Sequence, residues 1–180
     1  SAVTSNARLA AKIAKTGKAA GILFDIEQYQ SHLFDYSKQR DAKKKSFDEY
    51  AAQARRRGRE VMAAFQAGYP DLHVLMTYGY LLPYAQVGVN QSKLAIANYG
   101  LFKPFLDGMY EAAKGGTRII DGAELAYAYK TPAEFQNLRS EQAIIADKLT
   151  ADPAQFRKHA SLSFGLWIDD DWRKHGWSVS

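Results

Sequence analysis

The feature that most limits how this 180-residue chain can fold is a repeated alternation of helical and strand-like segments. Four apolar runs are typical of buried strands, and each follows a stretch with helical periodicity. In chain order these runs are AAGILFDIE (19–27), DLHVLMTYG (71–79), TRIIDGAE (117–124) and LSFGLWID (162–169). Alternation on this scale predicts an α/β fold with a parallel sheet and right-handed crossovers, because parallel strands need a long connection.

Start signals support the helices of this pattern. Ser46 with Glu49 forms a capping box before a helix that runs to about Gly68. Thr131 and Asp152 each precede a proline, which is the arrangement expected where a helix begins. Two more helices are predicted within SNARLAAKIAK (5–15) and PFLDGMYEAAKGG (104–116).

The loops after the first two strands favour part of a (β/α)8 (TIM-type) barrel over a doubly wound sheet, the other architecture left open. These loops run to about 18–20 residues, against about 2–6 in most such connections, and barrels place their active sites in loops at this end. Four strands make half a barrel. We therefore expect residues 1–180 to be one domain and a segment of a larger barrel. Its open sheet edges predict poor solubility or dimerisation of the isolated segment.

Acidic residues cluster at the carboxyl ends of the predicted strands. Side chains alternate along a strand, so Leu23, Asp25 and Glu27 share one face, while Ile22, Phe24 and Ile26 should pack on helices. The third strand ends at Asp121 with Glu124 just beyond it, and the fourth ends at Asp169. We interpret the set as a functional cleft, since carboxylates with perturbed pKa values gather at sites; capping of helices or exposure to water is the structural alternative.

Aromatic residues accompany these acids. Eight of the eleven tyrosines lie at or after predicted strand ends, and all three tryptophans cluster at the fourth run. A ring with a flat apolar face and a polar atom suits a sugar, although most of these rings should only pack the loops onto the barrel. We take Tyr29, Tyr78 and Trp167 as candidates for the sugar platform.

Acids and aromatics in a barrel mouth suggest hydrolysis of a glycoside. This reaction needs a carboxylic acid that protonates the leaving oxygen and a second group that acts as a nucleophile or base. Glu27 is the candidate acid, because an ionised neighbour such as Asp25 raises its pKa.

The run AGILFDIE resembles the chitinase-like family 18 motif D-G-x-D-x-D-x-E, with Gly21, Asp25 and Glu27 in place and Ala20 and Leu23 where two aspartates should stand. The resemblance implies that Glu27 is the acid and that Asp25 orients an N-acetyl group of the substrate. MTYG (76–79) is similar to the M-x-Y strand of the same family.

A broader resemblance covers most of the chain. The segments GILFDIEQY, FDYSKQ, IIDGAELAYAY and GLWIDDDWRKHGW resemble bacterial glycosidase-like barrel proteins of no named function. Many barrel glycosidases carry the second carboxylate three strands after the acid, which here implies Asp169, with Asp121 and Glu124 in reserve. The rival hypothesis is a non-catalytic barrel that binds carbohydrate.

Other classes of function rank lower. There is no phosphate-binding glycine motif, no cysteine and no H-E-x-x-H, and we expect no cofactor and no metal, although His32 near Asp25, Glu27 and Asp35 leaves a cation site open. The net charge of +5 comes mostly from KKK and RRR, expected on the solvated face of one helix, so we predict no nucleic-acid partner. No apolar run spans a membrane. The sequence does not fix the compartment.

Overall fold

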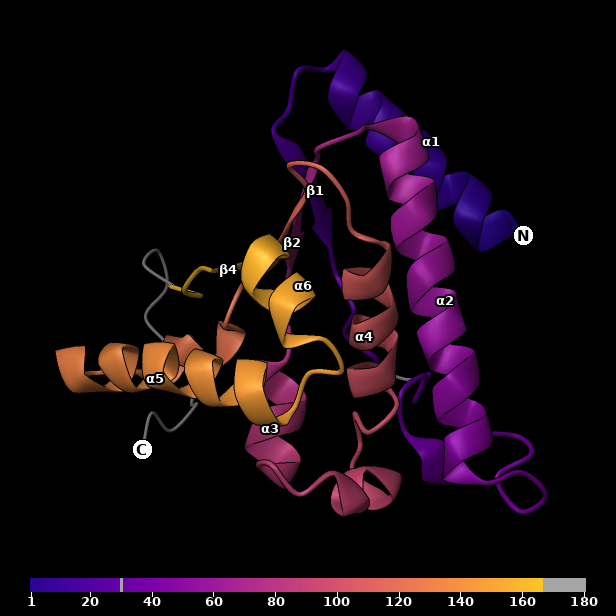
Figure 1. Ribbon diagram of the computed structural model, residues 1–180, viewed down its shortest axis with the longest axis vertical. Helices are drawn as coiled ribbons and strands as arrows, with labels where there is room; N and C mark the ends of the chain where they lie inside the picture. The colour runs from indigo at the N-terminus through magenta and orange to yellow at the C-terminus, as the bar shows by residue number, and fades with distance from the viewer. Residues whose placement is uncertain (30, 167–180) are drawn as a thin grey trace, which may run out of the picture.

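The computed structural model describes residues 1–29 and 31–166, and it contains a four-stranded parallel sheet (Figure 1). The strands are β1 (Gly21–Phe24), β2 (His73–Met76), β3 (Arg118–Asp121) and β4 (Ala160–Leu162). They pair in the order β1-β2-β3-β4, so that each strand lies beside the one before it in the sequence. The predicted α/β class and parallel sheet are confirmed, and the described residues supply four strands.

Six α-helices of the described part of the chain connect these strands or precede them. They are α1 (Ala2–Thr16), α2 (Phe47–Gly68), α3 (Leu81–Val87), α4 (Phe102–Ala112), α5 (Pro132–Lys148) and α6 (Pro153–His159). Three short 3-10 helices, η1 (Tyr36–Lys38), η2 (Gln91–Ile96) and η3 (Glu124–Ala128), lie in the connections that follow β1, β2 and β3. The long loops at the carboxyl ends of the strands are therefore partly helical.

The predicted helix starts are confirmed by their hydrogen bonds. The Ser46 hydroxyl accepts from Glu49 N at 3.2 Å, and Glu49 Oε2 accepts from Ser46 N at 2.8 Å, which completes the capping box of α2. Asp152 caps α6 by accepting from the backbone amides of Ala154 and Gln155, both at 3.0 Å. Each cap satisfies amide groups that have no partner within the helix.

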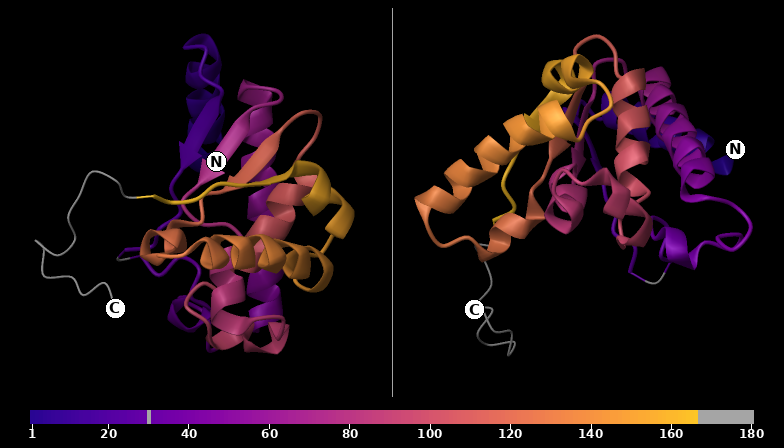
Figure 2. Two further views of the ribbon diagram at one scale, coloured as in Figure 1. Left: turned by 90° about the vertical axis from the view of Figure 1, so that its left-hand side faces the viewer. Right: turned by 60° about the horizontal axis from the view of Figure 1, so that its bottom comes forward.

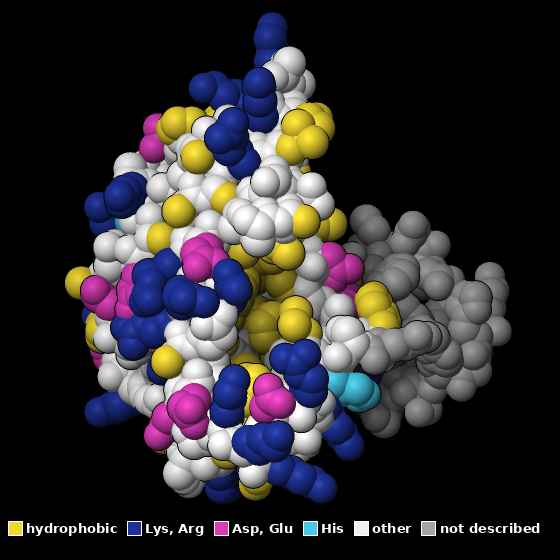
Figure 3. Space-filling model, turned by 90° about the vertical axis from the view of Figure 1, so that its right-hand side faces the viewer, with side chains coloured by type: hydrophobic (Ala, Val, Ile, Leu, Met, Phe, Trp, Pro, Cys, Tyr) yellow, Lys and Arg dark blue, Asp and Glu magenta, His cyan; other side chains and the backbone are white. Residues whose placement is uncertain are grey.

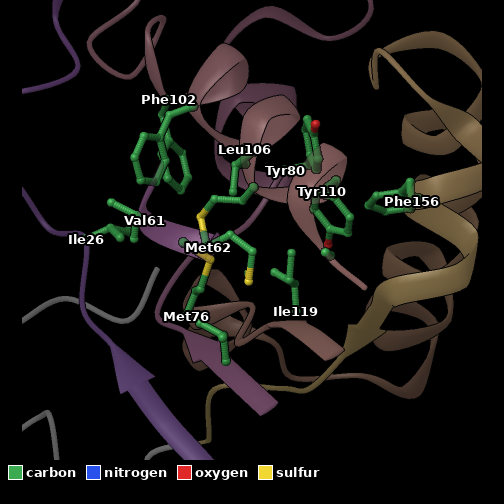
Figure 4. Close-up of a cluster of buried hydrophobic side chains, with 14 of the residues drawn as sticks. Ile26, Val61, Met62, Met76, Tyr80, Phe102, Leu106, Tyr110, Ile119 and Phe156 are labelled. Carbon is green, nitrogen blue, oxygen red and sulfur yellow. The ribbon is translucent and has the colours of Figure 1, made fainter. Parts of the chain in front are cut away.

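Helices α1 and α4 pack on α2, and α2 and α4 lie on one side of the sheet (Figure 1). The crossing of α2 and α4 is close because Gly58 and Gly108 face the opposite helix; a Cβ atom at either position would overlap a backbone carbonyl. Between this layer and the sheet lies the hydrophobic core, in which Met62 and Leu106 meet Met76 and Ile119 of the strands (Figure 4).

The opposite side of the sheet is not covered by these helices (Figure 2). Leu23 and Leu75, which are partners in the β1–β2 register, point to this side and are 66% and 36% exposed. Phe24 points the other way, and its ring packs against Phe65 and Phe105. The predicted division into two faces is confirmed for Leu23 and Phe24, whereas Asp25, Ile26 and Glu27 lie beyond the end of β1 and were wrongly predicted as part of the strand.

The structure corrects three details of the sequence interpretation. Strand β4 ends at Leu162, where the predicted fourth strand began, because its pairing starts with Ile119 opposite Ala160. Helix α3 was not predicted. The lysines at 43–45 precede α2 and are not part of it.

No helix among the described residues is long and apolar enough to cross a membrane.

Candidate functional site

Glu27 is held in place by the backbone at the carboxyl end of β1. Asp25 Oδ1 accepts a hydrogen bond from Glu27 N at 2.9 Å, which closes a local turn. The next residue, Gln28, is buried, and its N–H donates to Tyr99 Oη at 3.2 Å. Its side chain accepts from Phe34 N at 2.7 Å and donates to Asn98 O at 2.8 Å. These bonds join β1 to two loops and fix the direction of the chain at Glu27.

Glu124 reaches the same place from the end of β3. Ala123 adopts a left-handed conformation with φ of 45°, and this sharp turn starts η3 at Glu124. The backbone N–H of Glu124 donates to Thr77 O at 3.3 Å, which ties the turn to the end of β2. The residues after three neighbouring parallel strands thus meet at one edge of the sheet, as the topology requires.

The carboxyl groups of Glu27 and Glu124 lie close enough to interact directly. Tyr127 Oη donates to Glu124 Oε1 at 2.9 Å, whereas Glu124 Oε2 is buried and has no hydrogen-bond partner of standard geometry among the described residues. A buried acceptor without a partner costs free energy. A proton shared with a neighbouring carboxyl group would remove that cost.

The pKa of Glu27 is raised because opposing effects do not cancel. The largest single effect is a hydrogen bond with Tyr29, which lowers the pKa. Burial, the hydrogen bond and charge of Glu124 and the charge of Asp25 all raise it, and together they outweigh Tyr29. Glu27 therefore holds its proton to a higher pH than an isolated glutamate does.

Tyrosine hydroxyls surround the two glutamates. A hydrogen bond to Glu27 raises the pKa of Tyr29 to about 12. Burial, and then a hydrogen bond to Glu124, raise the pKa of Tyr127 to about 12 and that of Tyr78 still further. These phenols stay protonated at neutral pH and act as hydrogen-bond donors to carboxylates. We call Glu27, Glu124, Tyr29, Tyr78 and Tyr127 the carboxyl-end cluster.

A cavity of about 340 Å³ opens beside this cluster. Glu27, Tyr29, Tyr78 and Tyr99 line it, together with polar side chains of the loops. Its volume falls within the range of about 300–1,000 Å³ that small-molecule sites occupy. The cavity presents aromatic rings and hydrogen-bonding groups side by side.

Asp121 was a reserve candidate, and the structure gives it bonds to the backbone. It is buried; Oδ2 accepts from Leu81 N at 3.2 Å and Oδ1 from Ala123 N at 3.0 Å. Burial raises its pKa, whereas these amide bonds lower it. Asp121 positions the turns after β2 and β3, and it does not line the cavity.

The structure thus brings together Glu27, Glu124, Tyr29 and Tyr78 of the predicted site, with Asp25 at its base. Asp169 and Trp167 lie outside the described residues. Sequence reasoning missed Gln28 and the roles of Tyr99 and Tyr127, because their importance depends on hydrogen bonds between loops. Within 1–29 and 31–166, no three His, Asp or Glu side chains form a group that could hold a metal ion.

We compared the chain with protein-family models, with curated proteins and with solved structures, and nothing in any of the three matches it.

Proposed function

We propose that this chain is a glycoside-hydrolase-like protein that acts on a carbohydrate at the carboxyl ends of its strands, with Glu27 as the general acid. The observation that carries the proposal is the glutamate pair, beside a cavity lined by tyrosines. Glu27 has a raised pKa, and the buried Glu124 Oε2 lacks a hydrogen-bond partner of standard geometry among the described residues. A glycosidase acid must be protonated at working pH, and a raised pKa meets that need.

The proposal includes the architecture of a (β/α)8 barrel, of which the four strands are about half. Its support is the strand order, the helices on one side of the sheet and exposed leucines on the other. In a closed barrel this second side is the interior, where strand side chains pack in layers. Leu23 and Leu75 would then be buried by the remaining strands.

In the proposed reaction Glu27 gives its proton to the oxygen that leaves the sugar. The carboxylate that forms accepts a hydrogen bond from Tyr29, which favours the charged form. Glu124 and Asp25 disfavour that charge, so they promote the return of a proton to Glu27. The tyrosines and the polar side chains of the cavity would bind the hydroxyl groups of the sugar.

Glu124 acts first on the pKa of Glu27, which it raises. Retaining glycosidases separate their two carboxyl groups by about 5–5.5 Å and inverting ones by about 6.5–9.5 Å, and Glu124 stays a reserve candidate for the second carboxylate. We assign Glu124 to tuning the pKa of Glu27. Asp169 stays the proposed second carboxylate, and the resemblance to chitinase-like proteins offers the N-acetyl group of the substrate as the other possibility.

The test is Glu27→Gln, assayed on a panel of 4-methylumbelliferyl glycosides that includes the N-acetyl-β-glucosaminide. Loss of a general acid should lower kcat by about 100-fold or more. Glu141→Gln, on α5 and away from the cavity, is the control and should keep the wild-type rate. A Glu27→Gln variant with unchanged turnover would remove Glu27 as the acid.

The rival is a barrel that binds carbohydrate without hydrolysing it, which the tyrosine-lined cavity alone would also support. This protein would show no turnover of any glycoside in the wild type. It would still bind sugar by calorimetry, and Glu27→Gln would weaken that binding. An enzyme predicts the reverse, with turnover lost and affinity kept.

A further inference from the structure

A second and larger cavity, of about 600 Å³, lies between β1, α2 and the loop that follows β1. Its floor is apolar and is formed by Phe24, Ile26, Phe34, Val61 and Phe105. Figure 3 shows this face of the molecule, on which hydrophobic side chains line a hollow bordered by charged ones. The smaller cavity at the carboxyl-end cluster is lined mainly by polar and tyrosine side chains, so the two differ in chemistry.

Glu27 lines both cavities. A general acid has to reach the oxygen that joins a sugar to its leaving group, so its side chain lies between the sites for the two parts. A polar cavity and an apolar cavity that share the acid have the arrangement needed for a sugar on one side and an apolar leaving group on the other.

We propose that the apolar cavity binds the leaving group of the substrate, and that the substrate class is a glycoside with a neutral alkyl or aromatic leaving group. The inference rests on the proposed function. It adds the identity of the group bound on the far side of Glu27.

The charges around the cavity favour a neutral ligand. Asp25, Glu27 and Glu60 line it, and Arg57 in the same lining is already paired with Glu60. A carboxylate or sulfate group would meet these acids and find Arg57 engaged. An uncharged chain or ring would instead bury apolar surface, at a gain that grows with each methylene group.

The experiment compares methyl and octyl glycosides that carry the same sugar, first β-D-glucose and then N-acetyl-β-D-glucosamine. Affinities are measured by calorimetry below the concentration at which octyl glycosides form micelles, with Glu27→Gln used to prevent turnover. We expect the octyl compound to bind at least about tenfold more tightly than the methyl compound, because its chain buries several more methylene groups. Sedimentation velocity on the same samples reports the oligomeric state.

Two tryptophan substitutions on α2 test whether the octyl chain binds in the apolar cavity. Ala54 lines the apolar cavity, so Ala54→Trp should fill it and abolish the octyl preference without weakening the methyl glycoside. Ala52 is exposed on the same helix and does not line this cavity, so Ala52→Trp should keep the preference and control for the bulky ring.

Three results would overturn the inference while the proposed function stands. Equal affinity for the octyl and methyl glycosides is one, and an octyl preference that survives Ala54→Trp is another. The third is a change of mass with Ala54→Trp, which would make the hollow an interface with a second copy. The proposed function fails separately if the wild type hydrolyses no glycoside, and tight octyl binding would then define the cavity as a site for amphiphiles.

Discussion

The helix layer and the carboxyl-end cluster differ in how completely their carboxylates are hydrogen-bonded. In the helix layer, Asp107 of α4 is buried and receives three donors: Lys103 Nζ at 2.8 Å, Tyr80 Oη at 2.6 Å and Ala151 N at 3.1 Å. In the cluster, Glu124 has one oxygen bonded to Tyr127 and the other buried without a partner of standard geometry among the described residues.

The difference separates a structural network from a binding site. A buried carboxylate whose oxygens are all hydrogen-bonded stabilises the fold only while every partner is present. Such a carboxylate has no free acceptor position for a ligand. A buried acceptor without a partner costs stability, and a donor that reached it would recover that cost.

Asp107→Ala should cost about 3–5 kcal/mol of unfolding free energy, since it leaves the buried Lys103 ammonium without its carboxylate. Urea denaturation measures this cost. The matched control is Asp147→Ala, which breaks the ion pair with Arg157 where both side chains are 55% exposed, and it should cost no more than about 1 kcal/mol. Equal costs for the two variants would contradict the contrast between buried and surface pairs.

Gly58→Ala should destabilise the fold by about 1–3 kcal/mol, although alanine is the better helix former, because its Cβ atom would overlap the carbonyl oxygen of Phe105 and push α2 from α4. Gly17→Ala is the control: φ is −76°, and a Cβ there meets nothing closer than 3.4 Å. A neutral or stabilising Gly58→Ala would show that the crossing of the two helices tolerates a wider separation.

The helix layer could be predicted from the sequence, because the patterns that indicate helices are local. The capping box of Ser46 and Glu49 and the periodic apolar face of α2 depend only on neighbours within a few turns. The faces of β1 followed from the alternation of Ile22, Leu23 and Phe24. Helix α3 was not predicted, because its sequence, LLPYAQV, is short, contains Pro83 and has no side-chain cap.

The carboxyl-end cluster could be predicted only in part, because its geometry depends on the loops between the strands. Strand ends predicted that acids would gather at one edge, and Glu124 does meet Glu27 there. The turn at Ala123 determines that Glu124, and not Asp121, faces the site. The left-handed conformation of Ala123 could not be predicted, because this position is not a glycine. The Lys103–Asp107 pair looks like an ordinary surface pair in sequence, and only the packing of α4 buries it.

The smallest expected effect is the change in pH dependence of stability with Glu27→Gln. The folded-state pKa of Glu27 is raised, so its contribution to stability is complete below the pKa of the unfolded chain, about 4.3, and is lost as pH rises through the folded value. The glutamine side chain of the variant does not ionise. The variant should therefore match the wild type near pH 4 and be more stable at pH 7, by under about 1 kcal/mol because solvent screens the group.

Thermal unfolding of both proteins from pH 4 to 7 measures this difference, with Glu141→Gln expected to give a curve parallel to the wild type. A Glu27→Gln variant that is less stable at pH 7 would mean that the hydrogen bond from Tyr29 outweighs burial and the repulsion from Glu124 and Asp25. Glu27 would then be a carboxylate whose hydrogen-bond partners satisfy it, and its assignment as a general acid would fail. If Glu27→Gln is more stable than the wild type at pH 7 and has lost turnover, Glu27 lowers the stability of the fold and is required for the reaction.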